Sequence, residues 1–299
     1  MGPDHGIMFS GRLKPSWFVG ERTAFLGDWV RLMERATIVT QRPSSSLVVS
    51  LISKNSSVAE VQRLSQQIHD LMLQGPASLG SSNFRAIGPA DLWRMYQHYD
   101  RLFFEGTLSA AVLEACRGAL SFRVSERMTS AAGKTTRTRR ELKDGSVHLD
   151  FEIAISALLL FETFRDEERT ILVCGIRCED RLQALQRIFE HELIHLIEML
   201  VWGESNCSKP NFHHLARGHF GHLAAHHALV TPRERAATEH AIHIGDRVGF
   251  EFEGAYHVGI VNRITRRVTV LVEHPRGSPY TDGKRYMKFY VPMRELVKV

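Results

Sequence analysis

The sequence predicts a mixed α+β fold, in which a domain of helices and strands precedes a small all-β module. A long amphipathic helix is expected over residues 180–202, and alternating strand-like runs precede it at 120–124 and 147–155. Residues 244–299 contain strand-like runs only. A chain of 299 residues has room for both parts, because one hydrophobic core rarely grows past ~250–300 residues.

The first 85 residues are treated as an N-terminal extension of unknown role. A strand is expected at 47–52, after a turn-rich segment. A helix is expected from Ser57 onward, because apolar residues then recur at near-helical spacing. Glycine, serine and proline at 75–83 indicate a linker.

Residues 86–240 form the predicted mixed domain. Its first helix begins near Pro89, with Asp91 as a capping residue. The basic segment GKTTRTRR, residues 133–140, lies between the two strand-like runs. We expect a solvent-exposed hairpin there, and an edge that faces nucleic acid is the alternative.

Residues 241–299 form the predicted β module. Apolar residues alternate in four short runs, near 248–252, 258–261, 268–272 and 286–291, and glycine, aspartate or proline bounds each run. Short strands of this number are typical of a small SH3-like barrel.

The composition excludes several protein classes. With 43% hydrophobic and 24% charged residues, the chain is neither disordered nor collagen-like, and it is not a coiled coil. No stretch approaches the ~18 apolar residues of a membrane span, and the N-terminus lacks the apolar segment of a secretion signal. Four cysteines do not make a disulfide scaffold in a chain this long. We therefore expect a cytoplasmic protein, nucleoid-associated or nuclear in a eukaryote, with no membrane partner.

Residues 191–195 read His-Glu-Leu-Ile-His, within the long predicted helix. Positions i and i+4 lie on one helix face, so His191 and His195 can bind one Zn²⁺. Glu192 then lies beside the metal, where it can deprotonate a zinc-bound water for attack on an amide carbonyl. Ten of the sixteen histidines fall between His191 and His243, which also favours a metal site.

A catalytic zinc site usually has three protein ligands and one open position. The compact metzincin spacing is absent, because Val201 occupies the position of its third histidine. We choose His222 as the third ligand, since Gly221 before it can bring the backbone round to the site. The alternatives left open are His213, His214, His219 and, less favoured, Cys207.

Three segments together resemble a known family. Residues 99–108 (YDRLFFEGTL) match its "Y-N-x-x-F-F-x-G-x-L" helix and turn, the strand from Val147 ends where the family has "I-x-L-S", and residues 191–195 carry its metal motif. Over about residues 87–230 the chain therefore resembles the SprT/Spartan zinc metalloproteases. This resemblance implies a zincin-like α+β domain in which His191 and His195 bind zinc and Glu192 is the general base. Some members degrade proteins covalently trapped on DNA and are activated by DNA.

The chain departs from that family at two places. The family's third ligand is the histidine of an "H-G-x-x-F/W" motif; here Phe212 keeps the aromatic position, but Ser208 replaces the histidine. A serine hydroxyl is a poor zinc ligand. The zinc ribbon that many members carry is also missing, and we expect Cys174 and Cys178 to be buried thiols.

The β module carries most of the chain's net charge of +5, because residues 244–299 contain ten Lys or Arg against six Asp or Glu. Cations beside aromatic rings suit single-stranded nucleic acid, and a peptide-binding groove is the alternative. The aromatic candidates are Tyr280, Tyr286, Phe289 and Tyr290. The candidate nucleic-acid-binding residues are Arg263, Arg266, Arg267, Lys284, Arg285 and Lys288.

Two functions follow from these patterns. The first is a zinc-dependent endopeptidase that acts on DNA-associated proteins, including proteins crosslinked to DNA, with Glu192 activating a zinc-bound water. Its partners would be a protein substrate and DNA, with single-stranded DNA favoured. The second is a nucleic-acid-binding protein whose zincin domain is structural or degenerate, and Ser208 is the residue that favours it.

Overall fold

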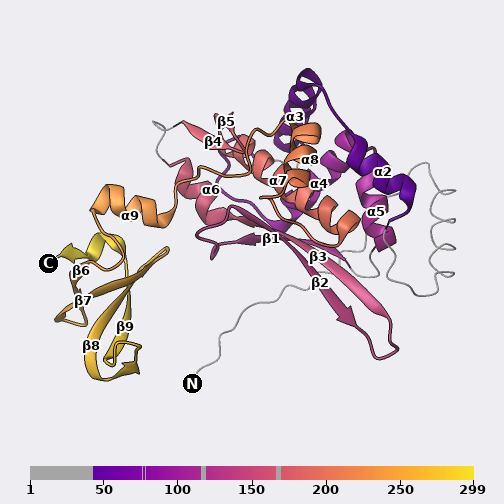
Figure 1. Cartoon of the computed structure of the whole chain (residues 1–299). Coiled ribbons are helices and arrows are strands. Elements are labelled where there is room, and N and C mark those ends of the chain that lie inside the picture. The colour runs from indigo at the N-terminus through magenta and orange to yellow at the C-terminus, as the bar shows by residue number, and fades with distance from the viewer. Residues whose placement is uncertain (1–42, 76, 78, 116–118, 166–169) are drawn as a thin grey trace. The chain divides into compact units, whose positions relative to one another are not determined.

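The structure is a computed structural model that describes residues 43–75, 77, 79–115, 119–165 and 170–299. These residues form a mixed α+β protein, which confirms the expected class (Figure 1). The helices are α2 (Ser45–Ser53), α3 (Val58–Leu73), α4 (Pro89–Phe103), α5 (Thr107–Ala115), α6 (Ala157–Thr163), α7 (Arg181–Trp202), α8 (Pro210–Phe220), α9 (Pro232–His240) and the 3₁₀ helix η1 (Met293–Glu295). The strands are β1 (Leu120–Ser125), β2 (Gly133–Glu141), β3 (Val147–Ser156), β4 (Ile171–Val173), β5 (Ile176–Cys178), β6 (Arg247–Phe252), β7 (Ala255–Ile264), β8 (Val268–Pro279), β9 (Arg285–Val291) and β10 (Val297–Lys298).

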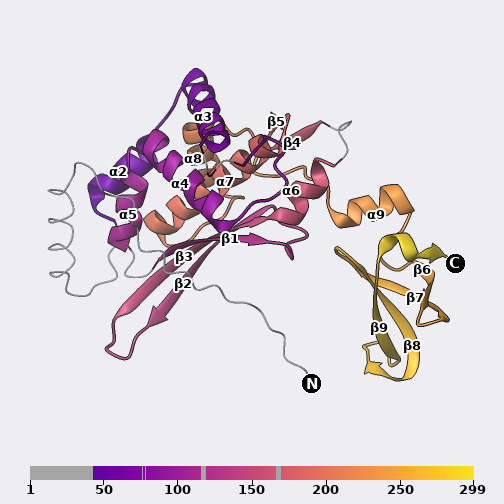
Figure 2. The ribbon, with the colours of Figure 1, turned by 180° about the vertical axis from the view of Figure 1, so that it is seen from behind.

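Helix α7 lies at the centre of the larger hydrophobic core, so the long helix predicted over 180–202 is confirmed. The Asp180 side chain caps its start by accepting a hydrogen bond from the Gln183 N–H at 2.8 Å. The helix ends at Trp202 and is capped by Gly203, whose φ of 82° is the left-handed conformation that favours glycine. Strands β2 and β3 pack against α7 on one side, and helices α3, α5 and α8 pack against it elsewhere (Figures 1 and 2).

The sheet beside α7 has the strand order β1-β3-β2. Strand β1 runs parallel to β3, and β2 runs antiparallel to it from Gly133 opposite Ile155 to Glu141 opposite Val147. The basic segment 133–140 is therefore itself a strand of the sheet. Within the described part of the chain, β2 pairs with β3 alone and forms an edge of the sheet.

The strand predicted at residues 47–52 is wrong, because this segment forms helix α2. Leu51 is fully buried in the larger core, and α2 packs against α5. A short apolar run fits a buried helix as well as a strand, so periodicity alone could not distinguish them. The helix predicted from Ser57 is confirmed as α3, and its Ser57 side chain accepts a hydrogen bond from the Glu60 N–H.

Helices α2 and α3 share one core with the mixed domain, although both fall within the predicted extension 1–85. The Gln186 side-chain amide of α7 donates to the Ser65 carbonyl at 2.9 Å, and the His219 Nε2–H donates to the Leu51 carbonyl at 2.7 Å. Residues 1–42 of that extension lie outside the described residues.

Residues 99–108 form the end of α4 and the turn into α5. The Asp100 carboxylate accepts hydrogen bonds from the Leu108 and Ser109 N–H groups at 3.1 and 3.2 Å. The turn uses positive φ angles at Glu105 (52°) and Gly106 (84°). The acidic and glycine positions of this motif therefore have a structural role in joining the two helices.

The C-terminal strands form a five-stranded antiparallel sheet of order β10-β6-β7-β8-β9, in which the last strand pairs with the first. The four predicted runs all lie in strands β6 to β9. Their inward side chains, with Val248, Phe250 and Val270 among them, form a second core cluster, to which Ala236 of α9 and Ile242 also contribute. None of the helices among the described residues combines the length and apolarity that a membrane crossing requires.

Candidate metal centre

His191 and His195 project from one face of α7, as their i, i+4 spacing predicts. Their Nε2 atoms lie 3.1 Å apart. Two imidazole ligands of a tetrahedral zinc, each ~2.0–2.1 Å from the metal, would have their nitrogens about 3.3 Å apart. The separation in the structure is therefore close to that of two nitrogens on one ion.

The other ring nitrogens of these histidines point away from each other and have partners of their own. His191 Nδ1 lies 3.8 Å from Cys174 Sγ, and His195 Nδ1 lies 2.6 Å from Ser205 Oγ. The Ser205 hydroxyl in turn donates to the Glu198 carboxylate. If the proton of each ring is on Nδ1, it points toward Cys174 or Ser205, and both Nε2 atoms have a free lone pair. The two lone pairs then face the same point, as they do in metal-binding histidines.

Burial keeps both rings uncharged at neutral pH. It lowers the pKa of His191 to about 2, with nearby His227 and His195 adding to the effect, and it lowers the pKa of His195 to about 4. Only a neutral imidazole has a lone pair to offer a metal. No proton therefore has to be removed before these two nitrogens can bind a cation.

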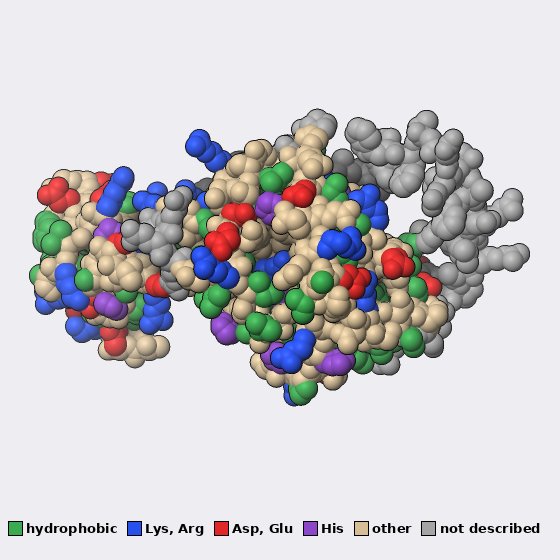
Figure 3. Space-filling view, turned by 90° about the horizontal axis from the view of Figure 1, so that it is seen from above, with side chains coloured by type: hydrophobic (Ala, Val, Ile, Leu, Met, Phe, Trp, Pro, Cys, Tyr) green, Lys and Arg blue, Asp and Glu red, His purple; other side chains and the backbone are tan. Residues whose placement is uncertain are grey.

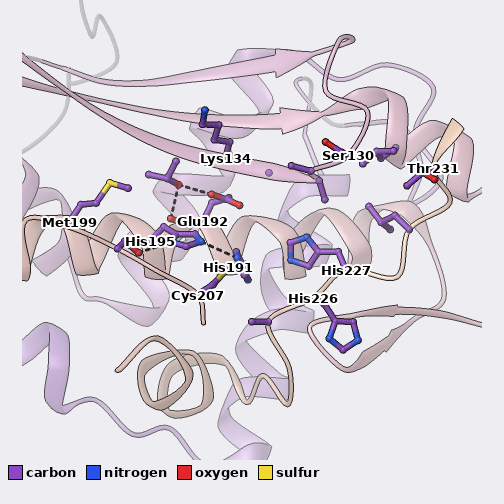
Figure 4. A pocket seen from close by; sticks show the side chains of 18 residues that line it. Ser130, Lys134, His191, Glu192, His195, Met199, Cys207, His226, His227 and Thr231 are labelled. Carbon is purple, nitrogen blue, oxygen red and sulfur yellow. Dashed lines mark hydrogen bonds between the residues drawn. The ribbon is translucent and has the colours of Figure 1, made fainter. Parts of the chain in front are cut away.

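Two overlapping groups of described residues have the spacing of metal ligands. Figure 4 shows His191, His195, Cys207 and His227 of these groups. One consists of His191, His195 and Cys207, and the other of Cys174, His191 and His227. Within each group the ligand atoms lie within 4.8 Å of one another. In addition, His227 Nε2 is buried without a hydrogen-bond partner among the described residues. The structure thus contains histidine and cysteine side chains positioned to hold a metal ion.

The structure does not bring the chosen third ligand, His222, into either group. Gly221 does turn the chain, with a φ of 66° at the end of α8, but the turn directs His222 into the core. There its Nε2 lies 2.8 Å from the Glu190 carboxylate. The geometry therefore favours Cys207 or His227 over His222.

The other residues considered for the third position also lie outside both groups. His213 and His214 are exposed on α8, and His219 is buried with its Nε2–H bonded to the Leu51 carbonyl. Ser208, at the family's histidine position, is exposed. As expected, Cys174 and Cys178 are buried thiols, and burial raises the pKa of Cys178 to about 12.

Glu192 is buried beside the two histidines and points toward β2 (Figure 4). Its Oε2 accepts a hydrogen bond from the Thr135 hydroxyl at 2.8 Å. Burial raises the pKa of Glu192 to about 7, although the Thr135 hydrogen bond opposes the shift. At Gly133 a Cβ atom would lie 2.4 Å from Glu192 Oε1, so glycine is what allows the strand to approach the carboxylate.

These side chains line a cavity of about 520 Å³. Its walls come from β2, from α7, from the segment that follows α7 and from the segment that ends at Thr231. His191, Glu192, His195, Cys207 and His227 all reach it. The candidate metal ligands and the carboxylate therefore share one space that a substrate could enter.

A buried charge network lies on the opposite side of α7 from the cavity-facing Glu192. The fully buried Glu190 carboxylate accepts hydrogen bonds from the Tyr99 hydroxyl at 2.7 Å and from the Arg187 guanidinium at 2.8 Å, and it also contacts His222. Burial alone would raise the pKa of Glu190, but the charge of Arg187 and the hydrogen bond with His222 outweigh it, and the pKa is lowered. Tyr99 of the 99–108 motif and His222 therefore have a structural role as partners of the Glu190 carboxylate.

The candidate nucleic-acid-binding residues lie in strands β7 and β9 and in the turns beside them, and all are exposed. Figure 3 shows, on the face of the C-terminal module seen from above, Lys and Arg side chains interspersed with acidic and hydrophobic ones. Tyr290 is 62% exposed, whereas Tyr286 is buried. The residues concerned are Arg263, Arg266, Arg267, Lys284, Arg285 and Lys288.

No family model matches the chain, and no curated protein and no solved structure matches it either. The resemblance to the SprT family therefore stays a prediction from the sequence motifs.

Proposed function

We propose that this protein is a zinc-dependent endopeptidase of the zincin type, similar to the SprT family. The observation that carries the proposal is the approach of His191 Nε2 and His195 Nε2 to 3.1 Å, with the buried Glu192 carboxylate beside them in one cavity. A pair of solvated surface histidines would need neither the Nδ1 partners nor the cavity.

The donor set fits zinc, because imidazole nitrogen and cysteine sulfur are its usual ligands in proteins. His191 and His195 would hold the ion, together with a third residue from one of the two ligand groups. Zinc, when bound in such a site, lowers the pKa of water and polarises a substrate carbonyl.

Glu192 would act as the general base and acid. Its carboxylate accepts the proton of the attacking water and then delivers that proton to the leaving amine nitrogen. A pKa raised to about 7 suits both transfers near neutral pH. The Thr135 hydroxyl holds one carboxylate oxygen in place, and the other lies against Gly133 in the wall of the cavity.

The edge of β2 supports a peptide as the substrate. This strand has an unpaired edge among the described residues, and its Gly133, Lys134 and Thr135 line the cavity. An extended peptide can add to such an edge as a further strand, held by main-chain hydrogen bonds. The scissile carbonyl of the peptide would then lie beside the metal ligands. Because main-chain hydrogen bonds would hold the peptide, the identity of its side chains would matter little for binding.

The test of this function is hydrolysis of an unfolded protein by the full chain after zinc removal and after zinc restoration. We expect chelation to stop hydrolysis and stoichiometric zinc to restore it. Hydrolysis that is unaffected by chelation would contradict the proposal.

Gly133→Ala is expected to lower peptide hydrolysis by about 10²-fold, since displacement of a reacting group by ~1 Å can cost that much. The added methyl would overlap the Glu192 side chain and displace its carboxylate. Zinc content should stay unchanged, because neither histidine is touched. Gly88→Ala, before α4, is the control, because an added methyl there meets no atom closer than 3.9 Å. Equal reductions in both variants would count against a role for Gly133 at the site.

The C-terminal module supports a nucleic-acid partner, and its strand order, with the last strand paired to the first, suits an SH3-like barrel. Arg263 pairs with Thr269 across β7 and β8, and Thr269 pairs with Tyr290 across β8 and β9. Lys288 is two residues before Tyr290 on the same strand. Arg263, Lys288 and Tyr290 therefore share one face, where two cations could meet phosphates and a ring could stack on a base.

Arg263→Ala combined with Lys288→Ala is expected to weaken binding of single-stranded DNA and to flatten its salt dependence. The slope of log K against log[salt] should fall by roughly 0.7 for each phosphate that the variant no longer neutralises. Arg294→Ala, at an exposed arginine on η1, is the control. An unchanged slope in the double variant would assign this face another partner, such as a peptide.

A further inference from the structure

The family's third zinc ligand is missing at its expected position in this chain. Ser208 stands there and is exposed, and it belongs to neither ligand group. Cys207, one position earlier, is half-buried and lines the cavity. Among the described residues, it is the member of the ligand groups that lies within 4.8 Å of both His191 and His195.

We propose that Cys207 supplies the third protein ligand, so that the site is built from two imidazoles and one thiolate. This inference rests on the proposed function, because it assigns a ligand of the same zinc site. A tetrahedral ion with a Zn–S bond of ~2.3 Å and a Zn–N bond of ~2.05 Å would place sulfur and nitrogen about 3.5 Å apart. A small contraction of the group would reach that separation.

The segment between α7 and α8 is folded so that Cys207 and not Ser208 faces the histidines. The Glu198 carboxylate accepts hydrogen bonds from the Ser205 hydroxyl and from the Asn206 N–H at 3.2 Å. The Asn206 side-chain oxygen accepts a hydrogen bond from the Ser208 N–H at 2.9 Å. The main-chain carbonyl of Asn206 accepts one from the Lys209 N–H at 3.0 Å. This turn directs Ser208 to solvent and leaves Cys207 on the side of the cavity.

The same carboxylate connects the two kinds of ligand. Ser205, which donates to Glu198, also lies 2.6 Å from His195 Nδ1. Glu198 therefore orients His195 through Ser205 and holds the chain that presents Cys207, which makes it a positioning residue for both. On α8, Phe212 packs against His191 and His195 with ring centroids 4.7 Å from each, which shields this side of the site.

The second ligand group does not complete the same site. Cys174 contacts His191 at Nδ1, on the other side of the ring from the Nε2 that faces His195. His227 belongs to a group with His191 but not with His195. One tetrahedral ion on both Nε2 atoms would therefore use Cys207, and His227 Nε2 would remain available to a substrate.

Cobalt substitution of the full chain tests this assignment without reference to activity. A thiolate bound to Co²⁺ gives a charge-transfer absorption in the near ultraviolet that imidazole and water ligands do not give. We expect this band in the parent protein, its disappearance in Cys207→Ser and its retention in Cys174→Ser. Zinc affinity should fall by more than ~100-fold in Cys207→Ser, as measured by competition with a chromophoric chelator. This is more than the loss expected for a residue that only hydrogen-bonds to a ligand.

Cys207→His is the rescue variant. It should restore zinc affinity to within about 10-fold of the parent while it lacks the near-ultraviolet band. A band that persists in Cys207→Ser, or cobalt bound by the parent without any band, would overturn the assignment of Cys207 and leave the zinc site itself intact. A parent chain that binds neither cobalt nor zinc would instead reject the proposed function and the thiolate ligand together.

Discussion

Glu192→Gln is expected to lower kcat for peptide hydrolysis by at least about 10²-fold to 10⁴-fold, the contribution of a general base. Glutamine has the same shape and its amide oxygen can still accept the Thr135 hydrogen bond, but it cannot take a proton from water. The measurement is steady-state hydrolysis of a peptide by the zinc-loaded full chain.

Two controls test whether a loss of hydrolysis in Glu192→Gln is due to the loss of the general base. The zinc content of Glu192→Gln should equal that of the parent, because the glutamate contributes to neither ligand group. Glu204→Gln, at an exposed glutamate shortly after α7, should hydrolyse the peptide at the parent rate. Hydrolysis by Glu192→Gln at the parent rate would show that another group activates the water.

Glu190→Ala is expected to lower the free energy of unfolding by about 3–5 kcal/mol, the usual cost of removing one partner of a buried ion pair. The change leaves the Arg187 guanidinium, whose side chain is 12% exposed, without its carboxylate, and it also removes a hydrogen-bond acceptor from Tyr99 and a neighbour of His222. Urea unfolding without added metal measures this effect separately from metal binding.

A surface ion pair on the same domain provides the matched control. Arg177 and Glu179 are 2.8 Å apart, but their side chains are 65% and 61% exposed. Glu179→Ala should therefore cost no more than about 1 kcal/mol. A destabilisation of that small size in Glu190→Ala as well would mean that the buried network contributes little to stability.

The parts of the fold with long, regular patterns could be predicted from the sequence. Helix α7 has a capping aspartate and keeps its apolar spacing over 22 residues, and the strands of the C-terminal module alternate cleanly between turn residues. The prediction for residues 47–52 failed because so short an apolar run contains too few periods to separate a strand from a buried helix.

The metal motif could be predicted for a different reason, since its i, i+4 spacing fixes the geometry within one helix. The third ligand proposed above, Cys207, could not be predicted, because its position depends on how the chain turns after α7. The glycine before His222 suggested a return to the site, whereas the hydrogen bonds of Glu198 and Asn206 bring Cys207 there instead. From the sequence alone, Cys207 is a less favoured alternative to the neighbouring histidines.

The roles of Thr135 and Gly133 could not be predicted, because their strand pairs with β3 and reaches Glu192 only through the tertiary fold. Thr135 and Glu192 are 57 positions apart in the sequence. The charged side chains of segment 133–140 indicate an exposed hairpin and carry no information about the small residues between them. Glycine at a point of close approach to a glutamate can be interpreted only once both are placed.

The most direct test of the central claim is cleavage of a protein bound to single-stranded DNA by the zinc-loaded full chain. Parent and Glu192→Gln are compared with and without DNA, and fragments are detected by gel electrophoresis. The account predicts fragments from the parent, more of them when DNA is present, and none from the variant. An intact substrate in every condition, with a parent chain that contains stoichiometric zinc, would contradict the endopeptidase and favour a protein that binds nucleic acid through a structural metal site.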